Sequence, residues 1–398
     1  MVTYTGNTRN KVFFTIFSGK NLKKESSVVI VSENNSFTQE FIMADASLKF
    51  LETFLNTSGP SGFETPQAAV YRNYLKKYAH KIDVDVLGNS IAVLNPDAEF
   101  KVMLAGHYDE IGFQVVDITE GGLVTFRAVG GIDKVTLPAL EVDIITDKGI
   151  VPGVIGRKPI HLQTPKERET VMEISDLWID IGASSRKEAE ALVSVADPIA
   201  MRSNCRFLNK NVIMSKGLDD KIGAYVIAEA FRMLAEAKVK IGVYAVGTVQ
   251  EELGLRGAEA STFGIKPNVG IAVDVGFATD VPGVDRKQWG DVKLGGGPIV
   301  SRNANVNPVL YRYIMDAAKK NKIDCQIQCG HRASGGTDTE RMQMSAGGVA
   351  TALISIPNRY MHTPVEICDI RDAKAAAKLI AKTVASLDPK CKFRPGID

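Results

Sequence analysis

From residue 45 onwards, hydrophobic positions recur alternately at helical spacing and in short continuous runs. Recurrence every three to four residues predicts amphipathic helices, and short β-branched runs predict buried strands. The predicted helices are Ser47–Asn56, Pro66–His80, Leu218–Ala237, Leu255–Phe263, Asn307–Lys320, Asp338–Met344 and Asp372–Ser386. The predicted strands include Lys101–Ala105, Ile241–Val249, Val269–Val275, Cys325–Gln328 and Val349–Ile354. This alternation predicts an α/β fold over 44–111 and 206–398, with a doubly wound mixed sheet and helices on both faces.

The segment between, 112–205, has a different pattern. Short strand-like stretches are separated by Gly, Pro and Asp, and the clear helical pattern there is Ser185–Leu192. The stretches are Phe113–Val116, Leu123–Ala128, Leu140–Thr146, Ile150–Ile155 and Leu177–Ile181. Strands at this spacing without intervening helices predict a small β-barrel or sandwich. We therefore expect a β-barrel-like domain inserted into the α/β domain.

Residues 1–43 form a third region, which is polar apart from the pieces VFFTIF and VVIV. The basic Arg9 and Lys11 precede Val12–Phe17, but this apolar piece is shorter than the ~7–15 residues of a signal peptide. We expect a poorly ordered N-terminal extension, with Met43 as a candidate translation start. The intact mass of the native protein tests that expectation.

Composition narrows the class of protein. The 398 residues carry a formal net charge of +2, which gives no electrostatic case for binding nucleic acid or an anionic membrane. The hydrophobic runs are far shorter than the ~20 residues that span a bilayer. Five scattered cysteines, an odd number, predict free thiols and a cytoplasmic, reducing location. The spacing of Cys325 and Cys329 is only a weak signal for a metal pair.

Acidic residues follow the predicted strands. Glu251 and Glu252 come after Ile241–Val249, and Asp274 lies within Val269–Val275. Strand ends are where α/β sheets gather functional groups, and neighbouring carboxylates resist ionising together unless a positive charge lies among them. Because no Lys or Arg occurs from residue 241 to 252, a metal ion is the economical source of that charge.

Other candidate ligands are His107, which forms H-x-D with Asp109, Asp219 before a helix, and His362 in a loop. Taken singly, each has a structural explanation, such as a helix cap for Asp219 and Asp220. Taken together, two histidines and several carboxylates suit a pair of zinc, cobalt or manganese ions. A two-metal site needs a bridging ligand and a carboxylate left to take a proton, and adjacent Glu251 and Glu252 can divide these tasks.

Eight short motifs occur in order along the chain. They are PSGFE, GHYDEIGF, LWIDIGASS, LDDKIG, QEELGLRGA, VDVG, GGTDT and HTPVE. Together, from about Ala44 onwards, they resemble the M42 family of metallo-aminopeptidases, the glutamyl or deblocking aminopeptidases of the tetrahedral (TET) type. The resemblance implies a zinc-peptidase α/β domain interrupted by a β-barrel-like dimerisation domain, and dimers that assemble into a dodecamer.

The resemblance also implies roles for residues. One metal would be held by His107, Asp219 and Asp274, and the other by Asp219, Glu252 and His362. Glu251 would be the general base and acid on a metal-bridging water, and Asp109 would orient His107. The implied reaction is hydrolysis of the N-terminal residue from short peptides.

Substrate recognition is less determined by the sequence. Gly336, Thr337 and Asp338 are predicted to shape the substrate pocket, although an ordinary turn and helix cap explains them equally well. Arg256, His331 and Arg332 would favour acidic first residues, or are surface charges or interface contacts.

Two other functions remain as alternatives. An endo-1,4-glucanase would use paired carboxylates without histidines, usually in an aromatic-rich groove. Aromatic residues make up only 7% of this chain, and Trp178 and Trp289 are remote in sequence from the acids. The second alternative is a metal-dependent scaffold without catalytic activity.

Overall fold

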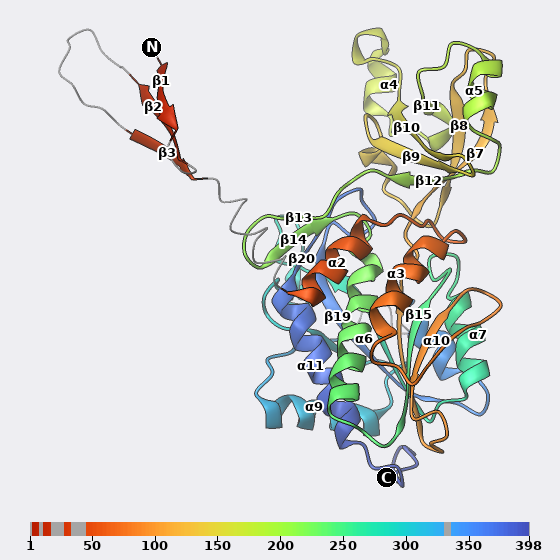
Figure 1. The fold of residues 1–398 in the computed structure, drawn as a ribbon, viewed down its shortest axis with the longest axis vertical. Coiled ribbons are helices and arrows are strands. Elements are labelled where there is room, and N and C mark those ends of the chain that lie inside the picture. Colours follow the sequence, from red (N-terminus) through yellow and green to blue (C-terminus); the bar gives the residue numbers. More distant parts are fainter. Residues whose placement is uncertain (1, 8–10, 17–27, 33–44, 330–335, 398) are drawn as a thin grey trace. The chain divides into compact units, whose positions relative to one another are not determined.

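A computed structural model describes residues 2–7, 11–16, 28–32, 45–329 and 336–397 (Figure 1). The chain divides into two compact units, Met1–Lys49 and Phe50–Asp398. The first unit contains three antiparallel strands in the order β1-β2-β3. Their bounds are Val2–Asn7 (β1), Lys11–Ile16 (β2) and Val28–Ser32 (β3). The described part of the predicted poorly ordered extension is therefore strand, because its β-branched and aromatic runs suit a pleated sheet; Met43 lies outside the described residues.

A large mixed sheet organises the second unit. Its main path runs β13-β14-β20-β19-β16-β6-β15-β5-β4, and β17 and β18 extend it from β19. The strands that carry the candidate residues, β15, β6, β16 and β19, are mutually parallel, and the flanking pairs are antiparallel. The bounds are Lys81–Val84 (β4), Ser90–Leu94 (β5), Lys101–His107 (β6), Arg206–Phe207 (β13), Val212–Ser215 (β14), Gly242–Thr248 (β15), Val269–Phe277 (β16), Ile299–Ser301 (β17), Gln326–Gln328 (β18), Ala350–Arg359 (β19) and Glu366–Asp369 (β20).

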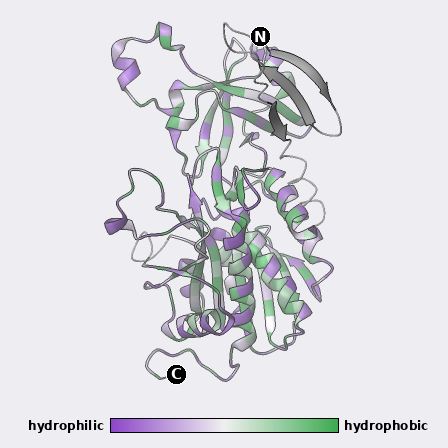
Figure 2. Ribbon diagram, turned by 90° about the vertical axis from the view of Figure 1, so that its left-hand side faces the viewer, coloured by the Kyte–Doolittle hydropathy of each residue, from purple (hydrophilic) through white to green (hydrophobic). Residues whose placement is uncertain are grey.

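Helices cover both faces of this sheet. Met103 and Ala105 of β6 pack with residues of α7 and α10, whereas Gly106, which faces the other way, lies directly against α6. Successive strand residues point to opposite faces, so α6 and the α7–α10 pair lie on different sides. The helices are Ala46–Asn56 (α2), Thr65–Leu75 (α3), Leu218–Glu236 (α6), Arg256–Ile265 (α7), Arg286–Trp289 (α8), Pro308–Asn321 (α9), Asp338–Gln343 (α10) and Ile370–Ser386 (α11). Figure 2 shows hydrophobic residues concentrated on the strands and on the helices packed against them.

A closed six-stranded antiparallel barrel interrupts this fold between β6 and β13, in the order β10-β11-β8-β7-β12-β9. The strands are Gly112–Ile118 (β7), Val124–Val129 (β8), Glu141–Thr146 (β9), Gly149–Gly156 (β10), Trp178–Asp180 (β11) and Pro198–Met201 (β12). The loops between the barrel strands contain two short helices and three 3-10 turns. The helices are Pro165–Glu169 (α4) and Arg186–Leu192 (α5), and the turns are Lys134–Thr136 (η1), Ile160–Leu162 (η2) and Ile174–Asp176 (η3). The barrel interior is a separate hydrophobic cluster that includes Phe113, Ile144 and Ile179. The mixed α/β fold and the barrel predicted from the pattern are both confirmed.

Several element bounds differ from the prediction. The helix predicted to reach His80 ends at Leu75, and the strand predicted to end at Ile354 continues to Arg359. The short strands β14 and β20 were not predicted. Such strands are too short to show a period, and their pairing depends on segments distant in sequence. Among the described residues, no helix is both long and apolar enough to cross a membrane.

Candidate metal centre

The candidate ligands meet at the carboxyl-terminal edge of the parallel strands. His107 is the last residue of β6, Asp274 lies towards the end of β16, and Glu251 and Glu252 follow β15. Asp219 enters from the start of α6, where its φ and ψ of −74° and 108° are not helical. A final ligand, His362, lies in the turn between β19 and β20.

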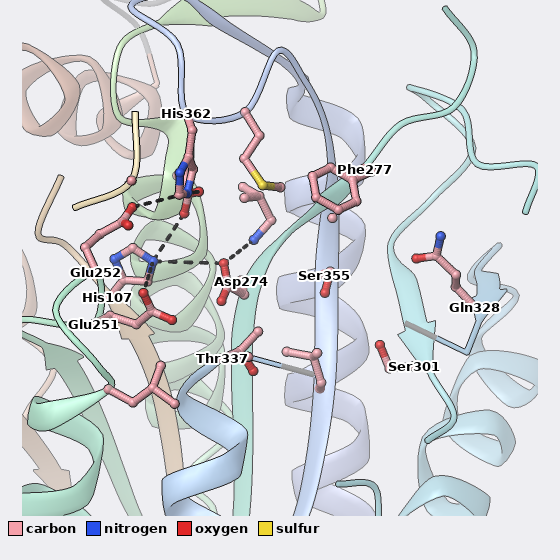
Figure 3. Close-up of a pocket in the computed structure, with 18 of the residues that line it drawn as sticks. His107, Glu251, Glu252, Asp274, Phe277, Ser301, Gln328, Thr337, Ser355 and His362 are labelled. Carbon is pink, nitrogen blue, oxygen red and sulfur yellow. Dashed lines mark hydrogen bonds and ion pairs between the residues drawn. The ribbon is translucent and has the colours of Figure 1, made fainter. Parts of the chain in front are cut away.

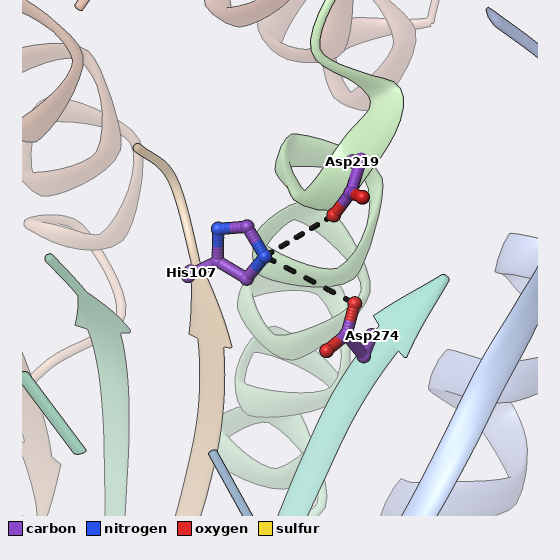
Figure 4. Close-up of side chains that lie close together, drawn as sticks. All are labelled: His107, Asp219 and Asp274. Atoms are coloured by element: carbon purple, nitrogen blue, oxygen red, sulfur yellow. Dashed lines mark ion pairs between the residues drawn. The ribbon is translucent and has the colours of Figure 1, made fainter. Parts of the chain in front are cut away.

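A first group consists of His107, Asp219 and Asp274 (Figure 4). The Nε2 atom of His107 lies 3.2 Å from Asp219 Oδ1 and 3.9 Å from Asp274 Oδ1. All three residues are buried. One ligand atom from each lies within 4.8 Å of the others, so the group has the spacing of a cation site.

A second group shares Asp219 with the first and adds Glu252 and His362. His362 Nε2 lies 3.2 Å from Asp219 Oδ2 and 3.6 Å from Glu252 Oε1 (Figure 3). The two oxygens of Asp219 therefore face different histidines. This is the arrangement required of a ligand that bridges two ions.

The acids of the cluster have strongly altered ionisation. Burial, with the negative charge of Asp219, raises the pKa of Asp274 to about 8 and that of Glu252 also to about 8. Burial raises the pKa of Glu251 well above its usual range. For Asp219, hydrogen bonds from two histidines outweigh burial and lower the pKa below its usual range. Burial and mutual repulsion thus favour the protonated forms of Glu251, Glu252 and Asp274, whereas the histidines favour the ionised form of Asp219.

The histidines respond in the opposite sense. Burial alone would lower the pKa of His107, but Glu251, Asp109 and Asp219 raise it well above its usual range. The hydrogen bond with Asp219 raises the pKa of His362 to about 9. Imidazole nitrogens and carboxylate oxygens are ligands of zinc, cobalt and manganese, and a divalent cation replaces the protons that the cluster otherwise holds. The residues present therefore fit divalent metal ions.

Asp109 lies beside His107, as the sequence predicts, and has a further set of contacts. His107 Nδ1 is 3.2 Å from the backbone oxygen of Asp109 and 3.4 Å from its Oδ1, which leaves Nε2 facing the cluster. The Asp109 carboxylate also accepts hydrogen bonds from the backbone N–H groups of Glu251 (3.0 Å) and Glu252 (3.2 Å), and from the Ser61 hydroxyl. It therefore fixes both glutamates as well as the histidine, which H-x-D spacing does not indicate.

The cluster lines one side of a cavity of about 460 Å³. Figure 3 places Phe277, Ser301, Gln328 and Ser355 beyond Asp274, on the side away from His107. These four residues could not be predicted from the sequence, because neutral side chains on separate strands and loops form no motif.

The predicted substrate-binding residues divide into two sets. Gly336 and Thr337 line the cavity, whereas Asp338 does not. Asp338 is buried and accepts a hydrogen bond from Thr248 Oγ1 at 2.6 Å. Among the other candidates, Arg256 lines a separate surface hollow, and His331 and Arg332 lie outside the described residues.

Among the described residues, the cysteines and tryptophans do not belong to the ligand groups. The five cysteines form no disulfide bond. Trp178 belongs to the barrel strand β11, and Trp289 contacts Phe277 edge-on, with ring centroids 6.5 Å apart.

Comparison with known proteins identifies relatives along most of the chain. The family profile described as M42 glutamyl aminopeptidase matches residues 88–379. The lysyl aminopeptidase of Pyrococcus furiosus is 37% identical over 349 residues, covering 86% of this chain and 97% of that protein.

Solved structures agree with this. A TET aminopeptidase from a Thaumarchaeota archaeon has a TM-score of 0.82 at 35% identity, with 87% of this chain and 98% of that one covered. The TET1 peptidase of Pyrococcus horikoshii, which can assemble into a tetrahedron or a large octahedral shell, has a TM-score of 0.77 at 33% identity, with 86% and 100% covered. A Thermotoga maritima protein described as an endoglucanase has a TM-score of 0.67 at 29% identity, with 83% and 95% covered. The chain belongs to the M42 family of aminopeptidases and is a peptide hydrolase.

Proposed function

We propose that this protein is a two-metal aminopeptidase that removes N-terminal residues from short peptides. The observation that carries the proposal is the position of Asp219, whose two oxygens face His107 and His362, each at 3.2 Å. In the proposal, one ion is held by His107, Asp219 and Asp274. The other is held by Asp219, Glu252 and His362. Zinc or cobalt fits this donor set best, and manganese is the third candidate.

Glu251 is the proposed general base and acid. When bound, two divalent ions would polarise the scissile carbonyl, anchor the free amine and lower the pKa of a water molecule. Glu251 follows β15 at the edge of the cavity, and its Oε2 lies 3.8 Å from His107 Nε2. Its carboxylate accepts a proton from the attacking water and returns it to the leaving amine. Asp109 holds the backbone of Glu251 in place for both steps.

The cavity favours neutral side chains at the first residue of the substrate. Within the described part of its lining, the charged side chains all belong to the metal cluster. The lining beyond Asp274 supplies Phe277 and the Ser301 and Ser355 hydroxyls. Asn303 also lines the cavity, and its buried amide nitrogen has no partner among the described residues. These described lining residues offer hydrogen bonds and apolar contact but no charge opposite to that of an acidic or basic substrate side chain. We therefore propose a preference for neutral over acidic or basic first residues.

The barrel is the proposed dimerisation domain, spanning 112–205. Ile150, Val154 and Ile160 are exposed on it, which suits a surface that another subunit covers. The related TET1 peptidase forms closed assemblies, so we propose dimers that assemble into a larger homo-oligomer, with a dodecamer as the expected size. Five thiols and no disulfide fit the reducing cytoplasm.

A substrate panel tests the proposal. Metal-stripped protein receives Zn²⁺, Co²⁺ or Mn²⁺ and is assayed on leucyl, glutaminyl, glutamyl and lysyl anilides, their amine-blocked forms, and carboxymethylcellulose. We expect metal-restored cleavage of the free-amine substrates, fastest with the neutral residues. Cleavage of cellulose without metal would overturn the peptidase proposal in favour of the glucanase alternative. Faster cleavage of the glutamyl or lysyl anilide would overturn only the proposed preference for neutral first residues.

A further inference from the structure

Glu366 is a buried carboxylate that lies outside the proposed ligand groups. It is the first residue of β20 and pairs in register with Ser215 of β14. Only 1% of its surface is exposed, and it does not line the cavity. The motif HTPVE places it four residues after His362 but indicates no function for it.

Both oxygens of Glu366 accept hydrogen bonds from the backbone of proposed metal ligands. Oε2 accepts from Asp219 N at 2.7 Å, and Oε1 accepts from His362 N at 3.0 Å. The Asn358 amide lies 3.4 Å from Oε2. One side chain thus joins the start of α6 to the turn between β19 and β20, two segments distant in sequence.

Among the described residues, neither backbone N–H group has another hydrogen-bond acceptor. The first N–H groups of a helix have no acceptor within the helix, and Asp219 is buried at such a start. His362 has a φ of +62°, so its N–H belongs to a left-handed turn rather than to the strand pairing on either side. By accepting from both, Glu366 fixes how far apart the two ligand-bearing segments lie.

We propose that Glu366 is a positioning residue that sets the separation of Asp219 and His362 and thereby the affinity of the second metal group. The inference rests on the proposed function, because that function makes these residues ligands. Glu366 holds two of the three members of the group Asp219, Glu252 and His362. In the group of His107, Asp219 and Asp274 it holds only one. Removal of Glu366 should therefore weaken the binding of one ion far more than the binding of the other.

The test variant is Glu366→Gln, which keeps the size of the side chain but replaces one acceptor oxygen with an amide that faces an N–H group. Metal-stripped protein is titrated with Co²⁺, followed by its visible absorption and by direct metal analysis. Residues that support metal ligands typically contribute 10- to 100-fold in affinity. We expect one of the two ions to bind about 10- to 100-fold more weakly and the other to change less.

Asp372→Asn is the matched control. Asp372 is also 1% exposed, and its oxygens accept from the backbone N–H groups of Gly295 (2.7 Å) and Gly297 (2.8 Å), in a loop outside the cluster. We expect this variant to bind both ions like the wild type. If Glu366→Gln also binds both ions like the wild type, or if both variants weaken binding equally, the proposal is wrong.

Two further measurements distinguish a variant that does not fold from a wrong proposed function and from a wrong role for Glu366. If Glu366→Gln does not fold, Glu366→Asp takes its place, since it keeps the carboxyl group but is too short to reach both segments. We then expect an intermediate loss for one ion, and wild-type affinity for both ions would overturn the proposal. A wild-type protein that binds no pair of ions contradicts the proposed function, and this inference with it. A wild type that binds two ions, with no effect of Glu366, overturns this inference alone.

Discussion

The barrel and the α/β domain bury different kinds of side chain. Among the described residues of 112–201, no ionisable side chain is buried, and the interior is the hydrophobic cluster around Phe113 and Ile144. The α/β domain buries His107, Asp219, Asp274 and further acids at one edge of its sheet.

The difference shows that the barrel interior serves to stabilise the fold, whereas the α/β domain also buries the groups of the candidate metal site. Burying a charge is costly unless it is paired or holds a metal, so a domain that contributes no charged group to a site has no reason to do so. The α/β domain buries charged groups at the edge where its parallel strands end, and there they lie close enough to one another to be paired or to hold a metal.

Removal of metal should abolish turnover while leaving the barrel intact. The protons on Glu252 and Asp274, with pKa values of about 8, and on His362, about 9, must leave before a cation binds. Binding therefore releases protons, and affinity should rise with pH up to about 9. Titration of metal-stripped protein at several pH values, with activity measured alongside, checks this. An affinity independent of pH would contradict it.

Glu251→Gln should lower kcat by about 10²- to 10⁴-fold, because a general acid–base group contributes about that much. The metal content should stay at the wild-type value, since Glu251 is not among the proposed ligands. Steady-state kinetics and metal analysis on the same preparation measure both quantities. Near-normal turnover would exclude Glu251 as the base.

Glu110→Gln should lower the free energy of unfolding by about 3–5 kcal/mol, because it leaves two buried ammonium groups without their carboxylate. Glu110 accepts from Lys216 and Lys221, each at 2.8 Å. Against the effect of burial, these lysines lower its pKa to about 2. Because the pKa is lowered in the folded state, the ionised Glu110 stabilises the fold fully above the ordinary pKa of about 4.3. This stabilisation is lost as the pH falls towards 2.

The wild type and Glu110→Gln should therefore converge in stability at acidic pH. Denaturant unfolding at several pH values tests this, and a difference that does not shrink below pH ~4.3 would show that the pair does not act through its charge.

Ile144→Val, in the barrel core, should have the smallest effect. It removes one buried methyl group and should cost about 0.5–1.5 kcal/mol of stability. Turnover per folded enzyme should not change, because this residue belongs to the barrel's own cluster. Thermal unfolding, together with kinetics measured well below the melting temperature, compares Ile144→Val with the wild type. A loss of turnover would mean that barrel packing and the metal cluster are coupled.

Local patterns were sufficient for much of the fold. The helix predicted at Leu218–Ala237 is Leu218–Glu236, and the strand predicted at Val269–Val275 is Val269–Phe277, because side-chain periodicity follows directly from backbone geometry. The short strands β14 and β20 could not be predicted, since their pairing depends on residues far away along the chain. The role of Asp338 was also beyond the pattern: a motif shows that an acid is present but not whether its side chain faces a cavity or Thr248.

Local sequence patterns were enough to predict the α/β and barrel regions, the order of their elements, and the acids and histidines of the candidate site. The folded chain was needed to see that the two oxygens of Asp219 face different histidines and that Glu366 joins Asp219 to His362. Side-chain type and spacing are local properties of a chain. The partner of a carboxylate depends on which distant segments the folded sheet brings to the same edge, and only the three-dimensional structure contains that information.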